Sequence, residues 1–223
     1  MKAIKIGDCI VPYTIKYGKY KRLSMKYDAK QQMLIILANR WISMTKIEEF
    51  IKRKHKWIVE QVNKPWKVVS IGRQIDVFGK RYPVSVILSN KNKVELKQEC
   101  IVYTTSRITE DEIVKRLKRF LKQCLQEYIS SIYNEVSLYT KVPNVKIRYR
   151  FMTSRFGVCY ALKREICLNT YLACFSKKAI HAVLYHEYAH FYQQNHSKKY
   201  YDVLYKMYPS YEKDMLELKY VVF

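Results

Sequence analysis

The sequence predicts an α+β protein, with a β-rich N-terminal region (residues 1–105) followed by a mainly helical region (residues 106–223). Polar and apolar residues alternate over much of the first region, which is typical of strands. From residue 109 onward, apolar residues recur every three or four positions, which is typical of helices. The composition, 49% hydrophobic and 27% charged, is that of a globular protein.

The N-terminal region is predicted to begin with strands and continue into one helix. The segments "VPYTIKYG" and "YKRLSMKYD" alternate on either side of Gly18–Lys19, and "QMLIILA" follows a polar turn. Thr45 and Glu48 then have the spacing of a capping box, and Pro65 follows the end of the pattern. One amphipathic helix over residues 45–63 is therefore expected, with a single apolar face formed by Ile47, Phe50, Ile51, Trp57, Ile58 and Val62.

Strand patterns return over residues 67–105, and a long helix is predicted to begin at Thr109, where Glu112 completes a second capping box. Residues 145–151 and 165–169 are predicted strands, and another helix opens at Ser176. The apolar stripe of the long helix has the spacing of a core-facing helix: Ile113, Leu117, Phe120, Leu121, Cys124, Tyr128, Ile132 and Val136.

The helix after Ser176 contains His186-Glu187-Tyr188-Ala189-His190. Residues i and i+4 lie on one face of a helix, so His186 and His190 are able to present two imidazoles to one metal ion. Glu187 follows the first ligand, where its carboxylate can reach a metal-bound water without binding the metal. This is the arrangement of a zinc peptidase site, with two histidine ligands and a glutamate that takes a proton from water.

A catalytic zinc needs a third protein ligand and an open position, and His196 is the candidate for the third ligand. A helix that continued to His196 would place it on the wrong side, so the chain must first turn back. Asn195 tolerates the left-handed conformation that ends helices, and Ser197 is placed to cap the next one. Chance accounts poorly for the pattern, because a shuffled chain of this composition contains HExxH in roughly one case in 150. His181 and His55 are expected to lie outside the site.

Composition suggests where the chain works. No apolar run approaches the ~18 residues of a membrane span, and the first residues lack the pattern of a signal peptide, so a cytoplasmic protein is expected. Six cysteines without a CxxC pair are predicted to be reduced thiols: Cys9, Cys100, Cys124, Cys159, Cys167 and Cys174.

The net charge of +23 admits two interpretations. It favours a polyanionic partner, so non-specific nucleic-acid binding is one expectation. Lysines, however, outnumber arginines 30 to 12 and are spread along the whole length, which is also what a biased composition produces.

Most of the chain resembles the YgjP-like metallopeptidase family, related to the SprT-like and WLM zincins. The family has a segment like R-W-G-S-C, a strand ending in L-N, a helix with H-E-L-A-H, and then N-H-[SG]-K-x-[FY]. Here these are "RFGVC" (155–159), "LN" (168–169), "HEYAH" (186–190) and "NHSKKYY" (195–201). The N-terminal strands and the helix with Trp57 also resemble the family pattern. Phe156 and Val158 depart from it, at positions that are not metal ligands.

The resemblance implies a minimal zincin domain within residues 106–223, with His186, His190 and His196 as zinc ligands and Glu187 as general base. No role is carried over for Arg155. The resemblance also implies that the strand before the active-site helix, here residues 165–169, borders the cleft, and as an edge strand it would accept an extended peptide. Covering of that edge by the N-terminal region is the alternative.

The expected function is therefore that of a zinc-dependent metallopeptidase, with one zinc per chain and a zinc-bound water activated by Glu187. Its substrate would be a peptide or protein. One alternative is a basic, nucleic-acid-associated protein with a SprT-like protease acting on DNA-bound proteins. The other is a non-catalytic metal-binding module.

Overall fold

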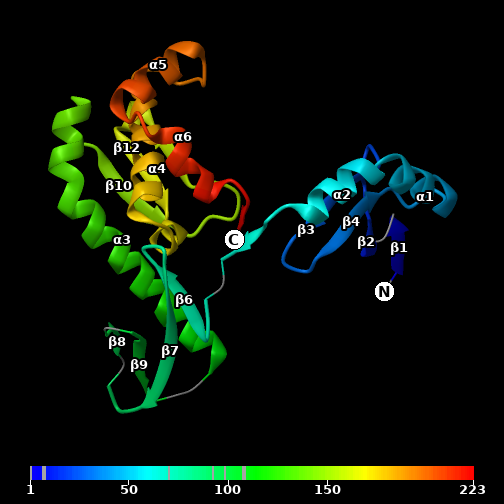
Figure 1. Cartoon of the computed structure of the whole chain (residues 1–223), viewed down its shortest axis with the longest axis horizontal. Coiled ribbons are helices and arrows are strands. Elements are labelled where there is room, and N and C mark those ends of the chain that lie inside the picture. Colours follow the sequence, from blue (N-terminus) through cyan, green and yellow to red (C-terminus); the bar gives the residue numbers. More distant parts are fainter. Residues whose placement is uncertain (1, 7–8, 70, 92, 98, 107–108) are drawn as a thin grey trace. The chain divides into compact units, whose positions relative to one another are not determined.

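The computed structural model describes residues 2–6, 9–69, 71–91, 93–97, 99–106 and 109–223 (Figure 1). The chain forms two compact units, Met1–Val68 with Tyr220–Val222, and Val69–Lys219 with Phe223. Both units combine helices with small sheets, which confirms the predicted α+β class. Among the helices described, none is long and apolar enough to cross a membrane.

The first unit is a four-stranded sheet packed with two helices. Its strands are β1 (Lys2–Ile6), β2 (Cys9–Tyr17), β3 (Ser24–Asp28) and β4 (Met33–Ala38), in the order β1-β2-β4-β3. The inner strands β2 and β4 are parallel, and the outer pairs are antiparallel. Alternate residues of β4 point into the core, where Leu34 and Ile36 pack with Ile47, Ile51 and Ile58 of the helices. A short parallel pair, β5 (Lys67–Val68) with β13 (Val221–Val222), completes the unit.

The predicted single helix over residues 45–63 is two helices, α1 (Met44–Arg53) and α2 (His55–Asn63). They divide at Lys54, whose N–H donates to both Phe50 O (3.2 Å) and Ile51 O (3.0 Å) and so tightens the last turn of α1. The predicted cap at Thr45 is also wrong. Ser43 is the N-cap, and its Oγ accepts from the N–H of Lys46. Ile42, just before the cap, packs against the core that contains Ile47, and this hydrophobic staple sets where α1 begins.

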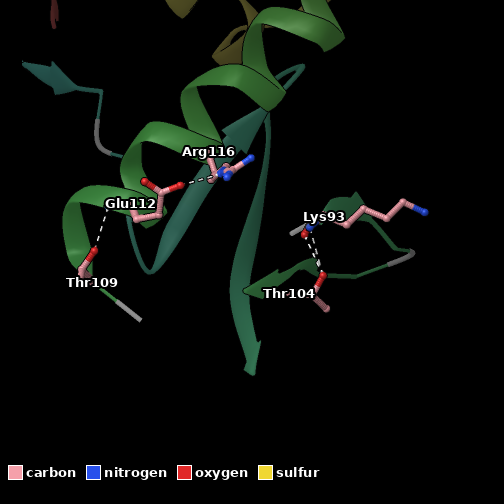
Figure 2. Close-up of polar contacts among 5 residues, drawn as sticks. All are labelled: Lys93, Thr104, Thr109, Glu112 and Arg116. Carbon is pink, nitrogen blue, oxygen red and sulfur yellow. Dashed lines mark hydrogen bonds and ion pairs between the residues drawn. The ribbon is translucent and has the colours of Figure 1, made fainter. Parts of the chain in front are cut away.

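The second unit begins with another four-stranded sheet and a long helix. The strands are β6 (Gln74–Val77), β7 (Lys80–Leu88), β8 (Lys93–Leu96) and β9 (Ile101–Thr105), in the order β6-β7-β9-β8. Figure 2 shows the edge contact of β8, where the Thr104 hydroxyl donates to Lys93 O and accepts from Lys93 N. The helix α3 (Glu110–Thr140) follows.

The predicted start of α3 at Thr109 is confirmed, since its Oγ1 accepts from the N–H of Glu112 at 3.3 Å (Figure 2). The Glu112 carboxylate forms an ion pair with Arg116 one turn later, at 2.7 Å. The cap joins residues three positions apart, which is why the spacing of Thr109 and Glu112 predicts it.

The predicted boundary at residue 105 differs from the boundary between the compact units, which lies at Val68–Val69. The change of pattern at residue 105 marks a change from strand to helix, and strands and helices pack together in one core. Ile75 and Val77 of β6 are buried, and the N–H of Phe78 donates to Ala173 O at 2.8 Å. The strands 74–105 therefore belong with the helical part of the chain.

The remaining elements are the histidine-bearing helix and its neighbours in the second unit. They are β10 (Lys146–Arg150), β11 (Gly157–Tyr160), the turn η1 (Ala161–Lys163), β12 (Glu165–Asn169), η2 (Thr170–Cys174), α4 (Lys177–Ala189), α5 (Lys198–Met207), α6 (Tyr211–Met215) and η3 (Leu216–Leu218). The sheet order is β10-β12-β11, with β12 parallel to β10 and antiparallel to β11.

The predicted strand at 165–169 is confirmed as β12, but it is the central strand of this sheet rather than an edge. Among the cysteines whose side chains the structure describes, all are free thiols: Cys100, Cys124, Cys159, Cys167 and Cys174.

Candidate metal centre

The helix α4 begins at the predicted residue and is buried along most of its length. The Ser176 hydroxyl accepts from the N–H of Ala179 at 3.2 Å and donates to the Glu217 carboxylate at 2.5 Å. Apolar side chains of α4 pack in the core, and Ile180, Val183 and Leu184 are at most 2% exposed. The last turn of α4, which carries His186 and Glu187, is thereby held against β11, β12 and the C-terminal helices.

Three imidazoles meet at the end of α4. His186, His190 and His196 each place one ring nitrogen so that all three lie within 4.8 Å of one another. His186 Nε2 and His196 Nε2 are 3.2 Å apart. Two nitrogens that bind one tetrahedral zinc at its usual bond length are about 3.3 Å apart, so the spacing of His186 and His196 fits this metal. Among the residues described, these three form the one group of histidine, cysteine and carboxylate side chains close enough to hold an ion.

The turn that returns His196 to the helix is not the predicted one. Residues with positive φ are found elsewhere in the described chain, and Asn195 is not among them. The helix already ends at Ala189, whose carbonyl accepts from the N–H groups of Tyr192 and Gln193. Because the reversal starts so early, the chain has enough residues to turn without a left-handed asparagine. Ser197 occupies the predicted N-cap position of α5, but its side chain makes no capping hydrogen bond.

Hydrogen bonds orient two of the rings. His186 Nδ1 lies 3.0 Å from the Tyr211 hydroxyl, and His190 Nδ1 lies 3.3 Å from Gln193 O. Because a neutral imidazole has one N–H, placing it on Nδ1 leaves the Nε2 lone pair free for a metal. Burial, and then the neighbouring His190 and His196, lower the pKa of His186 to about 3. His186 is therefore neutral near pH 7, as a metal ligand must be.

The ring of Tyr200 packs against all three imidazoles. Its side chain is fully buried, and its ring centroid lies 4.7 Å from those of His190 and His196. Its hydroxyl donates to His186 O at 2.9 Å, which ties α5 to the last turn of α4. The sequence pattern quoted above includes Tyr200, whereas Tyr211 lies 25 residues beyond its partner and carries no sequence signal.

Glu187 is 4% exposed and lies against Gly157 of β11. A Cβ atom at residue 157 would lie 2.5 Å from Glu187 Oε1, so only glycine leaves room for the carboxylate. Burial raises the pKa of Glu187 to about 8, while a hydrogen bond from the backbone of Cys159 and the charge of Arg155 lower it. A divalent cation held nearby would also favour the ionised form.

The histidines and Glu187 line a cleft of about 600 Å³. Its opposite wall is β11 with the following turn, residues 157–163, and Arg155 lies at its margin with an exposed side chain. The prediction that residues 165–169 border the cleft as an edge strand is therefore wrong. The hairpin closed by η1 places β11 outside β12, and β11 is the edge strand beside the histidines.

The other two histidines lie apart from the cluster. His181 packs against α3, with Nε2 2.7 Å from the Tyr128 hydroxyl and its ring stacked on that tyrosine. His55 is exposed on α2, in the other unit.

A family model described as YgjP-like, metallopeptidase domain, matches residues 21–220. The protein is therefore a metallopeptidase. Within that class, it belongs to the YgjP-like family. A comparison with curated proteins finds no match.

Two solved metallopeptidase zymogens are similar to part of the chain. Jannalysin of Methanocaldococcus jannaschii is 25% identical, and the match covers 41% of this chain and 91% of that one at a TM-score of 0.36. Abylysin of Pyrococcus abyssi is 16% identical, with 43% and 99% covered at a TM-score of 0.37.

Proposed function

We propose that the chain is a zinc-dependent peptidase in which His186, His190 and His196 hold one zinc ion and Glu187 is the general base. The observation that carries this proposal is that three imidazoles and a buried carboxylate face one cleft beside an edge strand. Three neutral imidazoles suit zinc, and three protein ligands leave a position open. Zinc bound there would supply a Lewis acid that polarises a carbonyl and lowers the pKa of water.

The chain's own residues supply the proton transfer. Glu187 adjoins His186 but is packed against Gly157, on the side of the cleft formed by β11. From there its carboxylate takes a proton from the attacking water and delivers it to the amine that leaves. A purely structural metal has no use for a buried carboxylate in an open cleft, which argues against the non-catalytic alternative.

The edge of β11 is the proposed peptide-binding element. In the sheet order, β12 pairs with one edge of β11, and the other edge faces away from β12. An extended peptide can add to such an edge by main-chain hydrogen bonds, which place its backbone along the cleft without requiring a particular side chain. Strand Gly157–Tyr160 thus takes the peptide-binding role that the family resemblance implies for residues 165–169.

Cleavage of a degenerate peptide library, read by mass spectrometry, tests this function. The purified chain with zinc should produce new peptide ends, a strong chelator should abolish them, and added zinc should restore them. Activity that survives complete removal of the metal would contradict the proposal, as would the absence of any cleavage by a folded, zinc-loaded chain.

Gly157→Ala should lower the cleavage rate about 10- to 100-fold while zinc binding persists. The added methyl would lie 2.8 Å from Glu187 Cγ and Cδ, so the carboxylate must move, and a misplacement of ~1 Å costs about 10²-fold. Gly72→Ala is the matched control, because nothing lies within 4 Å of its Cβ position. Equal rates for both variants would show that the position of Glu187 does not limit catalysis.

A further inference from the structure

A cluster of basic and aromatic side chains lies in the N-terminal unit, at one end of its sheet. The parallel strands β2 and β4 pair with Tyr17 opposite Ala38, and the N–H of Gly18 donates to Ala38 O at 3.0 Å. The loops that leave these strands, residues 18–23 and 39–43, are therefore neighbours. We call the exposed basic and aromatic side chains of these loops the basic–aromatic surface: Lys19, Lys21, Arg22, Arg40 and Trp41.

The surface carries unbalanced positive charge. Its four cations are exposed, and none takes part in an ion pair within the described part of the chain. The sequence has no acidic residue between Asp8 and Asp28, or between Asp28 and Glu48. Asp28 lies at the opposite end of β3 and accepts from the N–H groups of its own turn. The nearest acidic residues on α1, Glu48 and Glu49, are a turn beyond its start.

The basic–aromatic surface also includes a large aromatic side chain, Trp41, that lies outside the core. Trp41 is 93% exposed, although burying a tryptophan is normally favourable. The turn that carries it is fixed, since Asn39 Oδ1 accepts from the N–H of Trp41 (3.2 Å) and Asn39 O from that of Ile42 (3.1 Å). Ile42 packs against the core while Trp41 projects from it. The first loop is shaped by Tyr20, whose ring packs on Gly18.

Exposed cations beside an exposed aromatic ring on an ordered turn match the chemistry of single-stranded nucleic acid. The cations contact successive phosphates, and the indole stacks on a base, whose face is free only when the strand is unpaired. A lipid surface would instead favour several apolar side chains around the tryptophan, whereas the other four side chains of this surface are cations. We propose that the basic–aromatic surface binds single-stranded DNA or RNA. The proposal does not depend on the peptidase site.

The test is fluorescence anisotropy of a labelled oligothymidine of about 12 nucleotides across a range of salt concentrations. The parent chain should bind with a logarithmic salt slope of about −2 to −3, from about −0.7 for each of three or four phosphates. Trp41→Ala should weaken binding about 5- to 100-fold with the slope unchanged, because stacking is lost and the charges remain. Lys21→Ala/Arg22→Ala should weaken binding and make the slope shallower by about 1.4.

The matched control is Lys115→Ala/Lys122→Ala, which removes two exposed cations from α3 and should leave binding nearly unchanged. Circular dichroism shows whether each variant is folded. Equal losses from the two double variants would mean that binding follows overall charge and would overturn the assignment. Parental affinity of Trp41→Ala would do the same, as would binding to vesicles of anionic lipid but not to the oligonucleotide. Peptide cleavage is measured separately, so failure here leaves the peptidase proposal intact.

Discussion

Glu187→Gln retains the zinc site and loses most peptide hydrolysis, about 10²–10⁴-fold, on this account. Glutamine has nearly the same size as glutamate, so it fits the space that Gly157 leaves and keeps an oxygen to accept the hydrogen bond from the Cys159 backbone. It cannot take a proton from water near neutral pH. The loss is therefore specific to proton transfer.

The measurement for Glu187→Gln is zinc content and cleavage rate on the same preparation. Near-parental zinc with a strongly reduced rate supports the role of general base. A variant that cleaves at the parental rate would mean that Glu187 is a buried packing residue. A variant that loses its zinc would mean that the carboxylate helps hold the metal.

His186→Ala/His190→Ala should abolish stoichiometric zinc binding and, with it, all metal-dependent cleavage. The double variant removes two of the three imidazoles that meet within 4.8 Å, and a single imidazole cannot hold zinc tightly. His196→Ala should have a smaller effect on zinc affinity, because His186 and His190, one helical turn apart, remain. Its activity should fall as a consequence of the lost metal.

Equilibrium dialysis against zinc, followed by elemental analysis, measures both variants. His181→Ala is the control, since His181 contacts Tyr128 rather than the cluster. Full zinc retention by the double variant, in a folded chain, would place the metal elsewhere. Equal zinc loss in His181→Ala would point to damage to α4 rather than loss of ligands.

Local patterns predicted the parts of the fold and the candidate site that depend on neighbouring residues. The Thr109 cap, the start of α4 at Ser176 and the pairing of His186 with His190 follow from helical spacing, which fixes which side chains share a face. The proposed role of Glu187 comes from the same spacing. Each of these features involves residues at most four positions apart.

Features set by long-range packing leave no local signal in the sequence. In the sheet β10-β12-β11, β12 pairs with both neighbours and β11 is left at one edge. No local pattern in the sequence predicts the pairing of β12 with β10. The fit of Glu187 against Gly157 and the contact of Tyr211 with His186 each join residues 25 or more positions apart. The turn before His196 is predicted at Asn195 from the tolerance of asparagine for the left-handed conformation, whereas α4 already ends at Ala189.

The most direct test of the central claim is a zinc titration of the metal-free chain, followed by the cleavage rate on one peptide selected from the library. The histidine cluster offers one ion site, so the rate should rise in proportion to added zinc up to one equivalent per chain and then stay level. A rate that is already maximal without zinc, or that does not change as one equivalent binds, would contradict the account.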